Sequence, residues 1–398
     1  MQPIISRLIV KRFRSFPNEV ATFGNPTFLV GRNGAGKSNF ADLFSFVGEA
    51  MSSPLQAVFD RRGGISAVRN RSSGRSYPPN MGIGIHMGAI NGQVHSAHFA
   101  FEIKALPNYG FDIVREQCAV TQVDGTRYWY DRRGVEFRTN VQGLSPLLEP
   151  TALSLPVIGG DQRFAPVHRT LAAMRVYSIE PARLREMQDP DSGAALRSDG
   201  SNAASVLQEL NRTSEQSVEL IRQYLQGIVP NTTAVNPKKH GNKLSLEFVQ
   251  EWANAKPLRF EAYNMSEGTL RVLGLLLAVF QAPAPSVLVL EEPEATVHPG
   301  ALGAILDLIH HASRQMQVIV TTHSSDLLDG AKWLTDEHLR LVVWHEGASH
   351  LAPVADSVKS ALRQHLMGAG ELLRSNAMTP APLFDDRPDQ LPLFENLG

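Results

Sequence analysis

Hydrophobic and polar positions alternate near the start of the chain and then follow a helical period. Apolar runs at residues 4–13 and 26–30 predict two strands, and the second run stops at a cluster of glycines. Apolar side chains recur at helical spacing over residues 37–49, directly after the glycines. The pattern therefore predicts a strand, a glycine-rich turn and a helix in immediate succession.

The middle of the chain predicts a β-rich lobe followed by helices. Short alternating segments from about residue 80 to 131 predict an antiparallel sheet. Residues 60–79 are rich in Gly, Ser and Arg, and residues 144–197 in Pro and Gly, so both stretches predict irregular structure. The segment 203–227 has the clearest amphipathic period of this region and predicts one helix.

The last part of the chain alternates strands and helices, a pattern typical of an α/β layer. Helices are expected over residues 267–280 and after Pro299. Strands are expected at residues 243–248, 258–263, 287–290, 317–321 and 341–345. From residue 379 the chain is rich in Pro and Asp without a helical period, so we expect a flexible tail.

Composition narrows the class of protein. With 398 residues, 43% hydrophobic and 19% charged, the chain is globular and has room for two or three domains. A net charge of −1 excludes bulk attraction to nucleic acid or acidic membranes, and the single Cys118 excludes intrachain disulfides. We find neither the apolar core of a signal peptide nor an uncharged apolar run of membrane-spanning length, so we expect a cytoplasmic protein that does not act at a membrane.

The glycine-rich turn has the sequence of a phosphate-binding loop. Residues 31–38, GRNGAGKS, match G-x-x-x-x-G-K-[ST] between a strand and a helix, a context that a mere tight turn does not explain. Its backbone N–H groups would surround phosphates, Lys37 would neutralise their charge, and the Ser38 hydroxyl would bind Mg²⁺. The expected ATP contacts are Asn33, Gly34, Ala35, Gly36, Lys37, Ser38 and Asn39.

Polar residues follow three other predicted elements. Glu291 and Glu292 end the strand at 287–290, where Glu291 suits Mg²⁺ and Glu292 a general base, although a solvated acidic loop is the alternative. His323 ends another strand and is either a γ-phosphate contact or ordinary polar surface. Ser266 and Gly268 begin the helix at 267–280 and form either a second phosphate-binding end or a simple N-cap.

In this order, GRNGAGKSN, MSEGT, VLVLEEPE and TTHS resemble the ABC-type ATPase heads of the SMC, RecF and OLD group. The resemblance covers residues 1–49 and 263–346. It implies a P-loop NTPase of ABC-ATPase type and a homodimer in which Ser266 and Gly268 reach the ATP of the other copy. It also implies Glu292 as catalytic base and His323 as switch histidine, and it places His298, in the EEPE…HP form of the OLD-like and RecF-like branch, near the partner copy.

The expected fold is α/β, with a β-rich antiparallel lobe and a compact, mostly helical insertion added to the ATPase core. About 250 residues separate Ser38 from Glu291, enough for a lobe and a compact insertion but not for the long coiled coil of an SMC protein. The predicted parts are the N-terminal half of the head with its lobe at 1–140, the helical insertion at 141–257, the C-terminal half of the head at 258–375, and the tail at 376–398.

The departures from the family pattern and the chain's length limit the expected function. Glu291 stands where aspartate is more usual, and MSEGT replaces LSGGQ, which argues against a transporter head. About 50 residues follow the strand at 341–345, too few for the TOPRIM nuclease domain of OLD proteins. We therefore expect an ATP-hydrolysing switch that acts on DNA or on a separately encoded effector nuclease in anti-phage defence. The alternatives are a RecF-like repair factor and a non-hydrolysing scaffold whose ATP stabilises a dimer.

Two local features concern partners. Several arginines lie in a stretch, residues 61–79, that contains no acid, and the predicted strand at 4–13 is also basic. Both features suit either a DNA phosphate backbone or an ordinary solvated face. The arginines are Arg61, Arg62, Arg69, Arg71 and Arg75. The sequence QLPLF resembles the peptide by which bacterial proteins dock on the sliding clamp, or is a second apolar turn like Pro382–Phe384. The docking residues would be Gln390, Leu391, Leu393 and Phe394.

Overall fold

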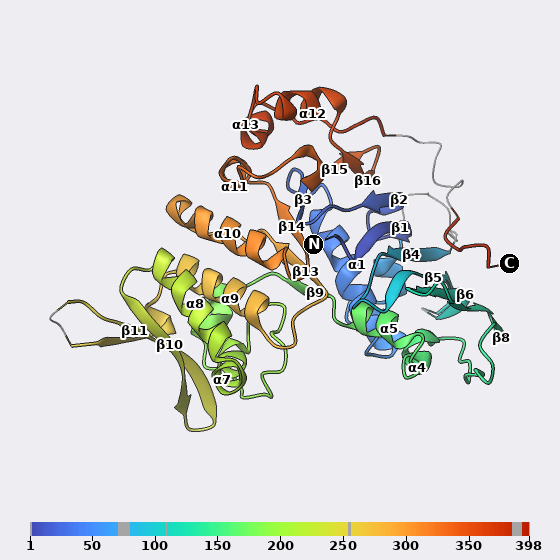
Figure 1. The fold of residues 1–398 in the computed structure, drawn as a ribbon, viewed down its shortest axis with the longest axis horizontal. Coiled ribbons are helices and arrows are strands. Elements are labelled where there is room, and N and C mark those ends of the chain that lie inside the picture. Colours follow the sequence, from blue (N-terminus) through green and yellow to red (C-terminus); the bar gives the residue numbers. More distant parts are fainter. Residues whose placement is uncertain (1, 71–79, 109, 254–255, 384–391, 398) are drawn as a thin grey trace. The chain divides into compact units, whose positions relative to one another are not determined.

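The computed structural model describes residues 2–70, 80–108, 110–253, 256–383 and 392–397 (Figure 1). The chain forms two compact units. The first unit comprises residues 1–174, 335–363 and 378–398, and the second comprises residues 175–334 and 364–377. None of the helices in the described ranges is both long and apolar enough to cross a bilayer.

A seven-stranded antiparallel sheet dominates the first unit, which confirms the predicted β-rich lobe. Its strand order is β2-β1-β4-β5-β6-β7-β8. The strands are β1 (Ile5–Phe13), β2 (Phe16–Thr22), β4 (Met81–Met87), β5 (Val94–Ala105), β6 (Phe111–Gln122), β7 (Arg127–Arg133) and β8 (Glu136–Thr139). Burial does not alternate strictly along these strands: β1 contains three consecutive buried residues and β5 contains five, so both faces of the sheet are covered there.

The helix α1 (Lys37–Ala50) packs on this unit through aromatic side chains. Phe13 and Phe16 of the first hairpin lie 5.5 Å, centroid to centroid, from Phe46 and Phe40 of α1. Short helices complete the layer: α2 (Leu55–Asp60), α3 (Ile65–Val68), α4 (Leu155–Ile158), α5 (Ala165–Ala172) and α12 (Asp356–Arg363). These contacts fix the position of the α1 N-terminus, where the glycine-rich turn ends.

The strand that leads into α1 lies beside a later part of the chain. β3 (Thr27–Val30) is buried along its whole length and pairs in parallel with β15 (Leu339–His345). β15 pairs in turn with β16 (Ala348–Pro353) in an antiparallel hairpin. The glycine-rich turn therefore starts at the carboxyl end of a buried parallel strand.

The second unit contains three parallel strands in the order β14-β13-β9, with helices packed among themselves. The strands are β9 (Arg175–Tyr177), β13 (Val287–Glu291) and β14 (Gln317–Thr322). The helices are α6 (Pro181–Arg185), α7 (Ala203–Thr213), α8 (Glu215–Ile228), α9 (Glu267–Phe280), α10 (Leu302–Ala312), α11 (Ser325–Gly330) and α13 (Ala369–Arg374). After α8 the chain forms a three-stranded antiparallel sheet. Its strands are β10 (Thr232–His240), β11 (Lys243–Gln250) and β12 (Leu258–Glu261).

Two expectations differ from the structure. The predicted helix at 203–227 is two helices, because Ser214 leaves the helical region (φ −150°, ψ 85°) and its Oγ accepts a hydrogen bond from Ser217 N at the start of α8. The tail predicted to be flexible contains Leu393, which is 3% exposed and packs with Ile9 and Ala100 of the seven-stranded sheet. The expected fold class, α/β with an antiparallel lobe and a largely helical insertion, is confirmed.

Candidate functional site

Three glycines shape the turn between β3 and α1, for different physical reasons. A β-carbon at Gly31 would lie 2.3 Å from the carbonyl oxygen of Val342 in β15. Gly36 has φ +113°, and a β-carbon there would lie 2.2 Å from Ser349 Oγ. Gly34 has φ +78° with open space around it. The first and last glycines are therefore required by close approach, and the middle one by backbone conformation.

Cationic and N–H groups converge on this turn. Lys37 is 6% exposed, and its Nζ donates to the carbonyl oxygens of Gly31 (2.8 Å) and Arg32 (3.3 Å). The first turn of α1 contains no acidic side chain, and its N-cap, Gly36, makes no side-chain cap. Such a helix end suits an anion, because its terminal N–H groups lack intrahelical acceptors. The exposed Ser38 follows Lys37 directly, in the position that suits a metal-binding hydroxyl.

The Asn39 side chain makes a hydrogen bond within the first unit. Its Nδ2 donates to Ser15 Oγ at 2.9 Å, and Ser349 Oγ donates to the same atom at 2.7 Å. The amide thus ties α1 to the β1–β2 turn and to β16, all in the first unit. Asn39 therefore supports the turn in this structure, and its contact with ATP stays a prediction.

In the second unit, Glu292 and His323 meet at the carboxyl ends of two neighbouring parallel strands. The register pairs Glu291 at the end of β13 with Thr321 of β14. Glu292 follows with φ +41°, and its backbone N–H donates to Thr321 O at 3.0 Å. This turn brings Glu292 Oε1 within 3.1 Å of His323 Nδ1. Both side chains remain partly exposed, so they can reach a ligand.

Glu294, which the sequence analysis did not single out, anchors the same loop. It is 9% exposed, and its Oε1 accepts a hydrogen bond of 2.5 Å from Thr322 Oγ1. Burial raises the pKa of Glu294 above its usual value, and this effect exceeds the opposing one of the Thr322 hydrogen bond. The third acid of EEPE therefore holds the loop against β14, a role whose only sequence signal is its place after Pro293.

Ser266 is the N-cap of α9, as the plainer of its two readings predicts. Its Oγ accepts a hydrogen bond from Thr269 N at 3.1 Å and lies 2.8 Å from Thr269 Oγ1. A β-carbon at Gly268 would lie 3.1 Å from Thr296 O, so the first turn of α9 contacts the loop that follows β13. Ser266 is exposed, which leaves this helix end accessible to a phosphate.

His298 lies on the same loop and is exposed. Its Nδ1 accepts a hydrogen bond of 3.1 Å from Gly300 N and caps the short 3₁₀ turn at Pro299–Ala301. The neutral ring therefore carries its proton on Nε2, and this nitrogen is not used in the cap.

The arginines at the start of the predicted basic cluster are bound to acids of α1. The Arg62 side chain is 8% exposed and contacts Asp42 at 2.9 Å and Glu49 at 2.8 Å, while Arg61 contacts Glu49 at 2.7 Å. These ion pairs already compensate the charges of Arg61 and Arg62, and their contact with DNA stays a prediction. Arg71 and Arg75 lie outside the described residues.

The predicted clamp-docking peptide is only partly described. Gln390 and Leu391 lie outside the described residues. Leu393 is buried on the sheet of its own unit, and Phe394 packs beside it. These two side chains therefore face their own chain in this state instead of a partner.

The sequence of this chain is similar to those of known proteins. Residues 27–145 and 179–329 match the family described as "AAA domain, putative AbiEii toxin, Type IV TA system". The phosphate import ATP-binding protein PstB of Mycoplasmoides gallisepticum is 31% identical over 106 residues, which is 26% of this chain and 30% of the relative's length.

The fold is that of SMC ATPase heads. A crystal structure of the SMC head bound to the C-terminal winged-helix domain of ScpA has 17% identity and a TM-score of 0.56, covering 88% of this chain and 97% of that one. An SMC head with an extended coiled coil from Pyrococcus furiosus, also bound to a ScpA domain, has 15% identity and a TM-score of 0.55, covering 92% and 100%. At these identities the likeness concerns the fold alone.

Proposed function

Because the chain belongs to the AAA-domain family described as putative AbiEii toxins of type IV toxin–antitoxin systems, we propose that it is an ATP-hydrolysing switch protein. The observation that carries this proposal is the 3.1 Å contact between His323 Nδ1 and Glu292 Oε1 at the ends of β13 and β14. A solvated acidic loop would not require the turn at φ +41° that brings Glu292 to this histidine.

The residues of the two units supply different parts of the reaction. The turn from Asn33 to Ser38 would hold the phosphates of ATP, with the Lys37 ammonium neutralising their charge. Ser38 of the first unit and Glu291 of the second each offer an oxygen of the kind that binds Mg²⁺, an ion that when bound offsets the negative charge of the phosphates. These oxygen ligands fit Mg²⁺, because this ion is usually held by one or two protein oxygens together with phosphates and waters.

Glu292 would act as the general base. Its carboxylate accepts a proton from the water that attacks the γ-phosphate, and a donor at Oε1 orients the second oxygen toward that water. His323 supplies this donor through Nδ1–H. Through this contact with Glu292, His323 would also respond to whether ATP has been cleaved.

The second phosphate-binding end suggests a dimer. Ser266 is exposed at the start of α9, and Gly268 lies against the loop that carries Glu292 and His298. We propose that this end binds the ATP of a second copy, so that two molecules enclose two nucleotides and separate after hydrolysis. His298 would then face the partner copy.

The output of the switch is proposed from the family description. A family of putative toxins suits a defence role in which the dimer acts on DNA or on a separately encoded effector nuclease. The rival role as a RecF-like factor on the sliding clamp is less favoured, because Leu393 of the proposed docking peptide is buried. We further propose a cytoplasmic location.

The test compares wild type with Glu292→Gln and with Lys37→Ala in full-length protein. We expect the wild type to hydrolyse ATP, Glu292→Gln to bind ATP but turn over about 100-fold more slowly or less, and Lys37→Ala to lose binding. Mass measured by light scattering should show Glu292→Gln as a dimer with ATP and a monomer without it. Stimulation by double-stranded DNA would support direct action on DNA, and its absence would favour a protein trigger.

Two results would contradict the proposal. Unchanged turnover in Glu292→Gln would remove this residue as the base. If neither turnover nor the lifetime of the dimer changed, the chain would be a non-hydrolysing scaffold.

A further inference from the structure

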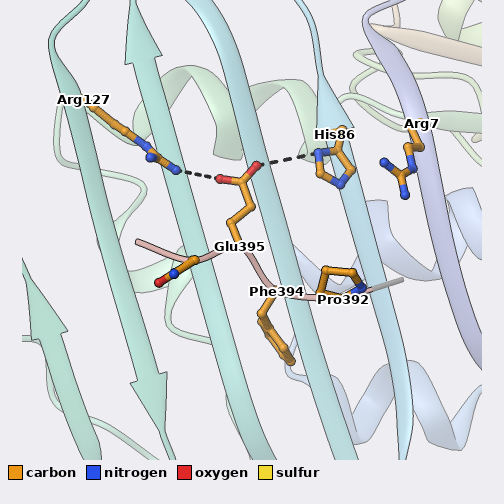
Figure 2. Close-up of a pocket in the computed structure, with 7 residues that line it drawn as sticks. Arg7, His86, Arg127, Pro392, Phe394 and Glu395 are labelled. Atoms are coloured by element: carbon orange, nitrogen blue, oxygen red, sulfur yellow. Dashed lines mark hydrogen bonds and ion pairs between the residues drawn. The ribbon is translucent and has the colours of Figure 1, made fainter. Parts of the chain in front are cut away.

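The tail segment, defined as Pro392–Asn396, lies on one face of the seven-stranded sheet (Figure 2). Leu393 is its buried residue, at 3% exposure, and contacts Ile9 of β1 and Ala100 of β5. This placement belongs entirely to the first unit. It concerns neither the phosphate-binding turn nor the Glu292–His323 pair, so it is independent of the proposed ATPase.

A slot in the sheet fits the Leu393 side chain. Gly82 and Gly84 lie two residues apart in β4, so their missing side chains open the same face. β-Carbons at these positions would lie 2.6 Å and 3.0 Å from the Leu393 Cδ atoms. Glycine weakens a strand interior and commonly marks a place where another chain or ligand approaches closely. The two glycines therefore form a socket that accepts one branched side chain.

The sheet also contacts the main chain of the tail segment. The Gln117 side-chain amide bonds to Glu395 twice, accepting from its N–H at 2.8 Å and donating to its carbonyl oxygen at 3.1 Å. His98 Nε2 lies 3.2 Å from Leu393 O. Burial lowers the pKa of His98 to about 3, so the ring is neutral at pH 7 and Nε2–H is the donor. Bonds to the main chain hold an extended peptide in one register.

Charged groups recognise the two residues that follow Leu393. Arg127 of β7 contacts the Glu395 carboxylate at 2.7 Å, and His86 of β4 lies 3.8 Å from its other oxygen (Figure 2). The Arg115 guanidinium lies 4.2 Å from the centroid of the Phe394 ring, within the range of a cation–π contact. Leucine, phenylalanine and glutamate thus each meet a different complementary group.

We propose that this face of the sheet is a peptide-binding site for the sequence Leu-Phe-Glu, and that the tail segment occupies it as a reversible intramolecular latch. Leu393 is the single fully buried side chain of the segment among its described residues. The Arg127 and Glu395 side chains remain 42% and 32% exposed, so solvent screens their attraction. Because these contacts must offset the entropy of ordering five residues, closed and open states lie close in free energy.

The consequence of the latch is control over two apolar side chains. While the latch is closed, Leu393 and Phe394 are withheld from other proteins. Any partner whose pocket accepts this pair competes with Gly82 and Gly84 for Leu393. The latch therefore makes partner binding depend on release from the sheet.

The test uses an N-terminally labelled hexapeptide, PLFENL, which has the sequence of residues 392–397. Its binding is measured by fluorescence anisotropy to the full-length wild type and to full-length protein carrying Leu393→Ser and Glu395→Ala, whose own tail cannot compete. We expect saturable binding to the double variant and at least tenfold weaker binding to the wild type. A peptide with serine in place of its leucine should bind at least tenfold more weakly than PLFENL.

Two changes in the sheet locate the site. Arg127→Ala and, separately, Gly84→Val in the double variant should each weaken binding of PLFENL at least fivefold. Arg138→Ala is the matched control, because this exposed arginine of β8 pairs with Glu136 and not with the tail segment. Thermal unfolding of every variant checks that weaker binding does not result from loss of the fold. If Gly84→Val does not fold, Arg127→Ala alone tests whether this face binds PLFENL.

Three results would overturn the proposal. A folded double variant that does not bind PLFENL would show that the face is not a peptide site. Equal binding to wild type and double variant would show that the tail does not occupy the site in solution. A concentration-dependent dimer of wild type that Leu393→Ser abolishes would show that tails exchange between copies instead of closing in one molecule.

Discussion

The imidazole Nδ1 of His323 lies 3.1 Å from Oε1 of Glu292, although 31 positions of sequence separate the two residues. The parallel register of β13 and β14 makes this contact possible, because Glu291 and Thr321 end their strands side by side. The turn at Glu292 then points its carboxylate at the residue following Thr322. Main-chain geometry thus positions both Glu292, the proposed base, and His323, the proposed switch residue.

Replacing His323 with alanine should impair turnover while leaving ATP binding intact. The histidine orients Glu292 and does not contribute to the phosphate-binding turn, so we expect kcat to fall by about 10- to 100-fold with an unchanged dissociation constant for ATP. His95→Ala, an exposed histidine of β5, is the control. A kcat equal to that of the wild type would show that the contact with Glu292 has no role in hydrolysis.

Gly36 and Gly34 of the turn should differ in their response to alanine. Gly36→Ala meets both a positive φ and Ser349 Oγ, so we expect a loss of about 2 kcal/mol or more in stability together with ATP binding. Gly34→Ala has the strained φ but free space, so about 1 kcal/mol is expected. Urea unfolding and ATP titration measure both effects. Equal losses at the two positions would contradict the steric role of Ser349.

Ser266 offers a way to separate capping from phosphate binding. Asparagine and aspartate both cap helices well, so Ser266→Asn and Ser266→Asp should unfold within about 0.5 kcal/mol of the wild type. Aspartate adds a negative charge where the γ-phosphate of the partner copy would bind, so only Ser266→Asp should abolish the ATP-dependent dimer. Dimerisation is measured in the Glu292→Gln background. A dimer in both variants would leave Ser266 as a cap alone.

Glu49 should contribute stability at neutral pH that is lost in acid. Burial opposes its ionisation, but hydrogen bonds from Arg62 and Arg61 outweigh this effect and lower the pKa of Glu49 to about 2. The pKa is thus depressed on folding, so the contribution is present above pH 4.5 and disappears as the pH falls toward 2. We expect Glu49→Gln to lower the free energy of unfolding by about 1–2 kcal/mol at pH 7 after screening.

Urea unfolding at several pH values between 7 and 2 checks this prediction. The difference between wild type and Glu49→Gln should shrink steadily below pH 4.5. Glu136→Gln, at a strongly exposed glutamate of β8, should change stability little at any pH. A Glu49→Gln effect that stays constant from pH 7 to pH 2 would show that the ion pairs with Arg61 and Arg62 do not cause it.

Local pattern was sufficient for the elements that carry the proposed chemistry. The helix predicted at 267–280 has those same bounds, because Ser266 caps its start and a continuous apolar run follows. The strands before Gly31 and Glu291 were likewise predictable from short buried runs. The break at Ser214 was missed, although Ser followed by Glu215 is an ordinary helix-start signal.

Features set by distant parts of the chain could not be predicted from local pattern. The basic cluster looked unpaired because no acid lies between residues 61 and 79, yet Asp42 and Glu49 reach Arg62 from one face of α1. Leu393 lies in a segment without periodicity, and only the fold of β4 reveals a socket for it. In both cases the contact joins residues that lie too far apart in the sequence for a local pattern to show it.

The two constrained glycines of the phosphate-binding turn differ in their freedom to evolve. Gly31 faces a carbonyl oxygen, which every residue at position 342 would present, so no substitution there can make room for a side chain. Gly36 faces the Oγ and Cβ atoms of Ser349, which only glycine at position 349 would remove together, and its φ of +113° would remain. A change at position 349 could therefore relieve the clash at position 36 but not the backbone strain, whereas the clash at position 31 has no comparable relief through a neighbouring side chain.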